Sequence, residues 1–303
     1  MKICYAYRRS NFYPYQGAEF PPASETALRR AYLEKVKAIG FDGIELPASL
    51  ADNFTEVQLD ELRSMLGDLD LTCAAVRGGG GLHNPRAAAG TRGRLEGAIQ
   101  FAASMGAGIL NTTVSTPQRD PEGPGRFVGE PHSQGSSRQA SADDFERSSD
   151  GLREFADMAA DLGIRISIEV HQHSIADCSW ATLHLLDLID RPNVGANPDL
   201  GNIYWTYDTP EESTEAAIVA LATRSIYWHC KNLVRVHIPE NRHSIFLRVP
   251  LPDGDLDYRF AMAAMLDAGF DGYLAVEGAR QGDQLSSDAR SLRYVREILA
   301  ELG

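Results

Sequence analysis

One local pattern, a helix followed by a glycine turn and a short apolar strand, recurs along the chain. Its clearest copies are AIGFDGIEL at residues 38–46 and AGFDGYLAVE at residues 268–277. Two further copies are MGAGIL at residues 105–110 and LGIRISIE at residues 162–169. In each copy a helical pattern ends at a glycine that suits the left-handed position after a helix. A chain built from this unit is expected to form parallel strands covered by helices.

The same pattern, followed along the chain, predicts eight short apolar strands with helices between them. These strands span residues 2–7, 42–46, 71–76, 108–114, 164–170, 194–199, 225–231 and 272–277. Eight such strands favour a closed barrel over an open doubly wound sheet, and no G-x-G-x-x-G sequence opens a helix after the first strand. We therefore predict one (β/α)8 TIM barrel domain over residues 1–303, although the length alone would also allow two domains.

Two connections that follow predicted strands are longer than simple turns. Residues 115–142 are rich in Gly, Pro, Ser and Gln, and residues 232–254 form the second long connection. Segments that follow barrel strands lie at the C-terminal mouth, so we predict that both are extended loops over the site. After the second loop, the apolar spacing predicts a helix from Asp255 to Ala268, with Asp255 as its N-cap.

Composition excludes several classes of protein. The 29 Lys and Arg against 42 Asp and Glu give a net charge of −13, which disfavours nucleic acid as a partner. No apolar run is long enough to span a bilayer, and the first residues lack the apolar core of a signal peptide. We therefore expect a cytoplasmic protein that does not act on membranes. The four widely spaced cysteines are expected to be reduced and buried.

The last four predicted strands each end in a residue type that binds metal ions. These residues are Glu169 in ISIEVHQH, Asp199 in NPDLGN, His229 in IYWHCKN and Glu277 in LAVEGA. In a barrel of this kind the carboxyl ends of the strands meet at one mouth, where reactive groups lie. Three carboxylates and one imidazole suit Mn²⁺, Mg²⁺, Co²⁺ or a catalytic Zn²⁺. The sequence therefore predicts one divalent-metal site at the mouth.

On these motifs the chain resembles the sugar phosphate isomerase/epimerase family of xylose-isomerase-like TIM barrels, including the D-tagatose 3-epimerase group. The resemblance covers essentially the whole chain, and its specific motifs lie between residues 164 and 278. It implies that Glu169, Asp199, His229 and Glu277 hold one ion, with Mn²⁺ first among the candidates. It also implies that Glu169 and Glu277 act as the acid and base on opposite faces of a sugar.

Metal-assisted proton abstraction next to a carbonyl explains why such a site needs these residues. A divalent ion stabilises the developing enolate oxygen, and one carboxylate removes the proton. Return of the proton to the opposite face gives an epimer, and return to a neighbouring carbon gives an isomer. Loss of a leaving group gives a β-elimination product. The sequence predicts an enzyme, most simply an isomerase or epimerase of a sugar or keto-sugar.

Two departures from the epimerase pattern keep a second activity open. The tagatose epimerase group has Asp-x-x-His after the sixth strand, whereas this chain has Asn202 in place of that His. His171 lies two residues after Glu169 on the same strand face and is a further catalytic candidate. An extra His beside the ion would suit a lyase that eliminates water or an aglycone from a 3-oxo sugar or C-glycoside. That lyase is the alternative reading.

Further residues at the strand ends are candidates to bind the sugar: Lys231, Asn202, Trp205, His83 and Arg248. Lys231 shares a strand face with His229 and could polarise a carbonyl or bind an anionic group. A catalytically idle binding subunit on the same barrel would be expected to lack a ligand, and all four are present. An apurinic-site endonuclease would need a His-rich metal cluster and a basic surface, and the sequence shows neither. The resemblance also implies a homo-oligomer or a subunit of a hetero-oligomer.

Overall fold

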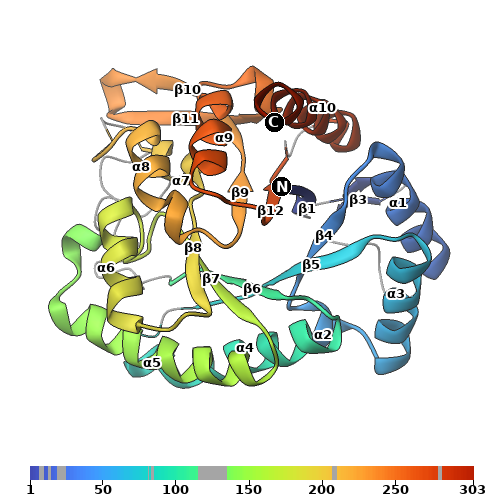
Figure 1. Cartoon of the computed structure of the whole chain (residues 1–303), viewed down its shortest axis with the longest axis horizontal. Helices are drawn as coiled ribbons and strands as arrows, with labels where there is room; N and C mark the ends of the chain where they lie inside the picture. Colours follow the sequence, from blue (N-terminus) through green and yellow to red (C-terminus); the bar gives the residue numbers. More distant parts are fainter. Residues whose placement is uncertain are drawn as a thin grey trace.

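The computed structural model describes residues 1–6, 10–12, 15–18, 25–80, 82, 85–114, 135–206, 210–278 and 282–303. His83 and most of the predicted loop at 115–142 lie outside these ranges. Eight parallel strands form the central sheet, and all eight fall where the sequence predicts them (Figure 1). They are β1 (Lys2–Ala6), β4 (Gly43–Pro47), β5 (Thr72–Arg77), β6 (Ile109–Thr112), β7 (Arg165–Glu169), β8 (Val194–Asn197), β9 (Trp228–Cys230) and β12 (Tyr273–Val276).

The eight strands curl into a nearly closed barrel. Hydrogen-bonded neighbours run in the order β8-β7-β6-β5-β4-β1-β12-β9. Strands β8 and β9 are joined by a single bridge between Ala196 and Ser225 rather than by a ladder. Further along this seam, the backbone N–H of His229 donates to the side chain of Asn197 at 2.6 Å. The predicted single (β/α)8 barrel is confirmed, and its one weak seam lies at the strand that carries His229.

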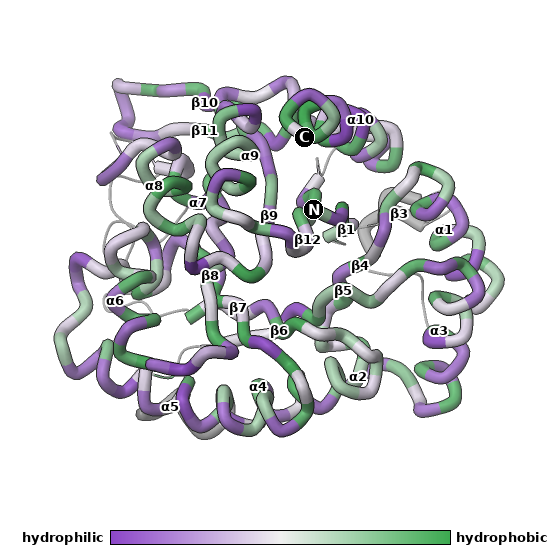
Figure 2. The backbone as a smooth tube through the Cα atoms, in the orientation of Figure 1, coloured by the Kyte–Doolittle hydropathy of each residue, from purple (hydrophilic) through white to green (hydrophobic). Residues whose placement is uncertain are grey.

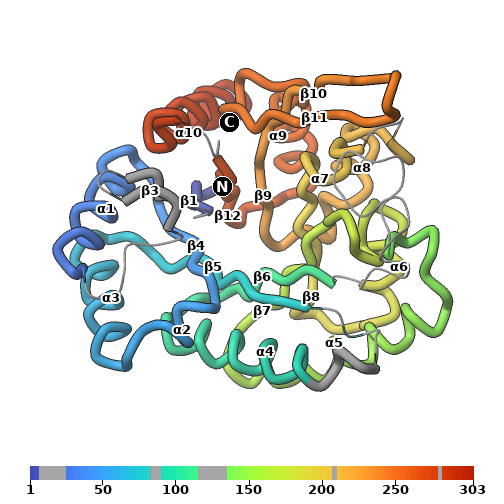
Figure 3. Tube along the Cα trace, turned by 180° about the vertical axis from the view of Figure 1, so that it is seen from behind, coloured from blue at the N-terminus to red at the C-terminus, as the bar shows by residue number. Residues whose placement is uncertain are grey.

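Helices form a ring outside the strands when the molecule is seen from either side (Figures 1 and 3). They are α1 (Thr26–Ile39), α2 (Leu50–Asn53), α3 (Glu56–Asp68), α4 (Pro85–Ser104), α5 (Ala142–Asp161), α6 (Ser179–Ile189), α7 (Leu200–Tyr204), α8 (Thr214–Leu221), α9 (Tyr258–Asp267) and α10 (Gln284–Leu302). Within the described ranges, no helix is both long and apolar enough to cross a membrane.

The glycine turns between helices and strands have the backbone conformation that the repeated pattern requires. Gly40, Gly106, Gly163 and Gly269 all have positive φ, between 68° and 110°. A side chain at such a position would crowd the following carbonyl, so glycine ends each helix at low cost. This shared turn places each following strand at the same level of the barrel.

The hydrophobic core has two layers. The larger layer lies between strands and helices and includes Ile3 and Tyr5 of β1 together with apolar residues of the helices. Apolar residues recur along both the strands and the helices (Figure 2). The smaller layer fills the barrel interior with mostly small side chains: Cys4, Ala6, Ala74, Ala75, Ile109, Tyr227 and Ala275. Cys4 and the other three cysteines are buried and free of disulfides, as predicted.

The predicted connection at residues 232–254 contains a two-stranded antiparallel hairpin, made of β10 (Asn232–Ile238) and β11 (His243–Val249). Phe246 of the hairpin meets the rings of Tyr204 and Trp205 edge to face, each with centroids 6.2 Å apart. A second small hairpin consists of β2 (Ser10–Phe12) and β3 (Tyr15–Ala18).

The helix predicted to start at Asp255 begins later, which corrects its N-cap. The cap is Asp257, whose side chain accepts from the N–H of Phe260 at 3.0 Å. Asp255 instead accepts hydrogen bonds from the hydroxyl of Tyr204 and the N–H of Arg235, both at 2.9 Å. Asp255 therefore ties the hairpin to α7 rather than starting α9.

Candidate metal centre and active site

Four consecutive strand ends bring their polar residues to the mouth of the barrel. Glu169 is the last residue of β7, and His229 lies within β9. Asp199 follows β8 as the N-cap of α7, and Glu277 follows β12. All four side chains are buried, with at most 3% of each residue exposed. The common level of parallel strand ends, predicted from the sequence, explains why residues so far apart in the chain meet.

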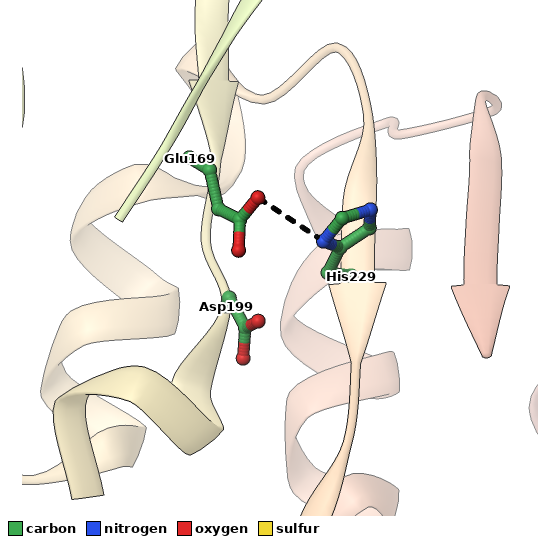
Figure 4. A group of neighbouring side chains, drawn as sticks. All are labelled: Glu169, Asp199 and His229. Atoms are coloured by element: carbon green, nitrogen blue, oxygen red, sulfur yellow. Dashed lines mark ion pairs between the residues drawn. The ribbon is translucent and has the colours of Figure 1, made fainter. Parts of the chain in front are cut away.

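Glu169, Asp199 and His229 form a compact group that could bind a metal ion. Each offers one ligand atom, and these atoms all lie within 4.8 Å of one another. Figure 4 shows the carboxylate of Glu169 facing the imidazole of His229, with Asp199 close to both. Nδ1 of His229 lies 3.4 Å from an oxygen of Glu169. Carboxylate oxygens with one imidazole suit a hard or borderline divalent ion, so the donor set fits the predicted cofactor.

Glu277, the fourth predicted ligand, is paired with cationic side chains. Nζ of Lys231 donates to Glu277 at 2.9 Å and to Asp199 at 2.7 Å, so it bridges the two carboxylates. Arg248 from the hairpin donates to the other oxygen of Glu277 at 3.2 Å. Burial raises the pKa of Asp199 to about 6, and the adjacent Lys231 opposes that rise. The chain thus places its own ammonium between two of the predicted metal ligands.

Glu45, in the middle of β4, contacts the imidazole of His229. Its carboxylate lies 2.7 Å from Nε2 of His229 and accepts from Arg77 at 2.8 Å. Burial lowers the pKa of His229, but the carboxylates of Glu45 and Glu169 outweigh it and raise that pKa to about 10. A carboxylate on one imidazole nitrogen fixes the ring so that the other nitrogen faces the site, a common arrangement behind metal-binding histidines.

Amide side chains fix the carboxylate of Glu169. Asn111, in β6, donates to one of its oxygens at 3.0 Å, and Asn202 donates to the other at 3.2 Å. Asn197 in turn donates to the carbonyl oxygen of the Asn111 side chain at 3.1 Å. The sequence reasoning missed Asn111 and Asn197. Their positions on β6 and at the end of β8 are the signal that would have found them, because the same rule identified the ligands.

The remaining predicted residues lie around the same carboxylates. His171 lines a cavity of about 750 Å³ together with Glu169, Glu277 and Arg248. Burial lowers the pKa of His171, which favours its neutral form at pH 7. The ring of Trp205 lies 5.5 Å from Nζ of Lys231 and 5.3 Å from the guanidinium carbon of Arg248. Both cations therefore lie close to the ring of Trp205.

The architecture is a (β/α)8 barrel whose mouth carries a buried group that could bind a metal ion, and the comparisons give its family. A model of the xylose isomerase-like TIM barrel family matches residues 33–298, and the chain belongs to this family. L-ribulose-5-phosphate 3-epimerase UlaE of Salmonella paratyphi C is 24% identical over 141 residues, which are 46% of this chain and 45% of that protein. The chain thus spans about half the length of the curated relatives it matches.

Solved structures share the fold over nearly the whole chain. A xylose isomerase-like TIM barrel protein from Mycobacterium smegmatis, in complex with magnesium, has a TM-score of 0.76 and 21% identity, covering 100% of this chain and 98% of that one. D-psicose 3-epimerase with D-tagatose from Clostridium cellulolyticum H10 has a TM-score of 0.69 and 16% identity, covering 100% and 98%. The predicted family resemblance is confirmed.

Replacing Lys231 by Met tests whether its ammonium compensates the buried carboxylates. The variant is expected to lose about 3–5 kcal/mol of unfolding free energy. Removal of the ammonium leaves the buried carboxylates of Asp199 and Glu277 without the positive charge that compensates them. Saturating Mn²⁺ should then raise the melting temperature of the variant more than that of the wild type, since the ion replaces the missing positive charge. Lys37→Met, at an exposed ion pair with Asp70, is the control. Equal stabilisation of both proteins by Mn²⁺ would contradict this assignment.

Metal binding is expected to release a proton from His229. Its pKa of about 10 keeps the imidazole protonated near neutrality, whereas a ligand nitrogen must be deprotonated. The apparent affinity for Mn²⁺ should therefore fall about tenfold for each unit by which the pH is lowered below that pKa. Calorimetric titration in buffers of different ionisation enthalpy measures the released proton. His184→Gln, on the exposed face of α6, should leave the result unchanged, and an affinity independent of pH would show that His229 is not a ligand.

Proposed function

We propose that the chain is a divalent-metal-dependent isomerase or epimerase that moves a proton next to the carbonyl of a sugar or keto-sugar. The observation that carries this proposal is the buried group of Glu169, Asp199 and His229 at the barrel mouth. Glu277 lines the same cavity as Glu169, so two carboxylates face the space where a sugar would lie. The epimerase names of the relatives support the same reaction class.

Glu169, Asp199 and His229 are the residues that would hold the ion, and Glu277 would join them if Lys231 released it. When bound, a divalent ion supplies positive charge that stabilises the sugar oxygen as negative charge develops on it. Mn²⁺ remains our first candidate, with Mg²⁺, Co²⁺ and Zn²⁺ as alternatives, and the magnesium complex of a related barrel supports a divalent ion.

Glu169 and Glu277 are the proposed acid and base. The amides of Asn111 and Asn202 hold both oxygens of Glu169, which fixes the direction in which it can accept a proton. Lys231 and Arg248 hold Glu277 in the same way from the other side of the site. Two carboxylates oriented by separate sets of donors can remove a proton from one position of a sugar and return it at another.

Six further residues are proposed to orient the sugar or assist the proton transfer. The side-chain oxygen of Asn202 is buried and has no partner among the residues the structure describes, so it can accept a sugar hydroxyl. Lys231 and Arg248 can donate to sugar oxygens, and Trp205 can support a ring face. Neutral His171 can relay a proton, and His83 remains a predicted contact. No contact in the described site favours the lyase alternative over proton transfer.

Glu169→Gln and Glu277→Gln test the acid and base. With Mn²⁺ and a panel of keto-sugars in D₂O, the wild type should introduce solvent deuterium into a recovered epimer or isomer. Each variant should lower that exchange rate by about 10²–10⁴-fold, because an amide cannot take up the proton. The control is Glu96→Gln on the exposed face of α4. An unsaturated or cleaved product would instead support the lyase, and full exchange by both variants would refute the assignment.

A further inference from the structure

The cavity over the candidate active site extends well beyond the reacting groups. Its volume is about 750 Å³. Glu169, Glu277 and His171 line one end, and the wall continues past Arg77 to the outer face of α4. A free hexose occupies roughly 180 Å³ at the packing density of organic crystals. The cavity therefore holds much more than one sugar ring, and the excess volume lies on the side of α4.

The polar groups at the α4 end suit a neutral, hydroxyl-rich ligand. Arg94 of α4, Asp52 of α2 and Ser49 all line this end of the cavity. A sugar hydroxyl both donates and accepts, so a guanidinium and a carboxylate can bind it together. The same carboxylate would repel a phosphate or another anion at close range.

In the described part of the glycine-rich loop after β5, residues 78–80, two backbone N–H groups are already used within the protein. The N–H of Gly78 donates to the carbonyl of Asn111 at 3.1 Å, and that of Gly80 donates to the carbonyl of Thr113 at 3.3 Å. A phosphate cradle needs several such N–H groups directed at the ligand. This loop instead uses them to join β5 to the end of β6.

Packing does not explain the glycines that face the cavity from α4. A Cβ atom at Gly93 or Gly97 would have no atom of the described residues within 4 Å. Each glycine inside a helix costs about 1 kcal/mol relative to alanine. Both glycines line the cavity, and because they have no side chains they leave more space in it. Both glycines therefore leave open space at this end of the cavity.

We propose that this enzyme acts on a glycosylated sugar rather than on a free monosaccharide. The reacting ring lies between Glu169 and Glu277, and a second sugar ring attached to it lies along α4. Arg94 and Asp52 bind the hydroxyls of that second ring, over the open surface at Gly93 and Gly97. The inference rests on the proposed function, since it assigns a substrate class to the same site.

Gly93→Phe tests the second-ring position, because a Cβ at Gly93 has open space and a bulky side chain there can occupy the volume proposed for the second ring. Free ketohexoses and their glucosylated counterparts, such as turanose and isomaltulose, are compared by deuterium exchange with Mn²⁺ present. In the wild type, kcat/KM should be at least tenfold higher for a glycosylated sugar. Gly93→Phe should remove that advantage and leave exchange on the free ketohexose within about twofold. Gly97→Phe serves as a second variant, and Gly93→Ala should retain the preference.

Gly67→Phe is the matched control, because Gly67 lies in α3, away from this cavity, and a Cβ there also meets nothing within 4 Å. A wild type that prefers free ketohexoses, or a Gly93→Phe variant that slows both classes equally, would overturn the inference. Absence of exchange with every sugar would overturn the proposed function instead. Calorimetric binding of the same glycosylated sugars then decides the inference: loss of binding in Gly93→Phe supports it, and unchanged binding overturns it.

Discussion

The candidate site depends on how positive charge is supplied to carboxylates that the barrel buries. Glu45, Glu169, Asp199 and Glu277 are each at most 3% exposed. Ionised carboxylates in such surroundings are costly unless cations and hydrogen-bond donors surround them. Lys231 lies between Asp199 and Glu277, and His229 lies between Glu45 and Glu169. Lys231 and His229 therefore stabilise the buried carboxylates at the barrel mouth, and each contacts at least one predicted metal ligand.

This arrangement links the metal to the protein's own charges. A divalent ion at Glu169, Asp199 and His229 would bring two positive charges close to Lys231 and to a protonated imidazole. Like charges at such separations repel strongly where water is excluded. The imidazole must lose its proton, and the contact between Lys231 and Asp199 must weaken. Lys231 would keep its contacts with the carboxylate of Glu277 and the ring of Trp205.

The sequence predicted the barrel well because local physics determines it. A glycine with positive φ ends each repeated unit, and a short apolar strand follows. Strand β9 is shorter than predicted: it spans Trp228–Cys230, and Ser225 makes only an isolated bridge to Ala196. The predicted start of α9 was also wrong, since Asp255 bonds to Tyr204 and Arg235. The start of α9 depends on side-chain contacts that no periodic pattern reveals.

The sequence predicted which strand ends carry the site residues, but it did not predict the contacts between those residues. The rule that strand ends share one mouth predicted that Glu169, Asp199, His229 and Glu277 would come together. It did not predict that Glu45 would contact His229, because 184 residues separate them and only the closed barrel makes them neighbours. Nor could it assign partners to Lys231, although strand alternation placed Lys231 on the face of His229.

The weak seam between β8 and β9 explains why these contacts occur where they do. A regular ladder there would use the backbone N–H of His229 and leave the amide of Asn197 without that partner. With a single bridge at the seam, Asn197 accepts from His229 and donates to Asn111, which in turn donates to Glu169. One chain of hydrogen bonds thus connects the backbone of β9 to the carboxylate of β7. The ladder hydrogen bonds missing at the seam are thus replaced by side-chain hydrogen bonds that fix two of the three ligand residues, Glu169 and His229. A metal site needs ligands that are held in fixed positions.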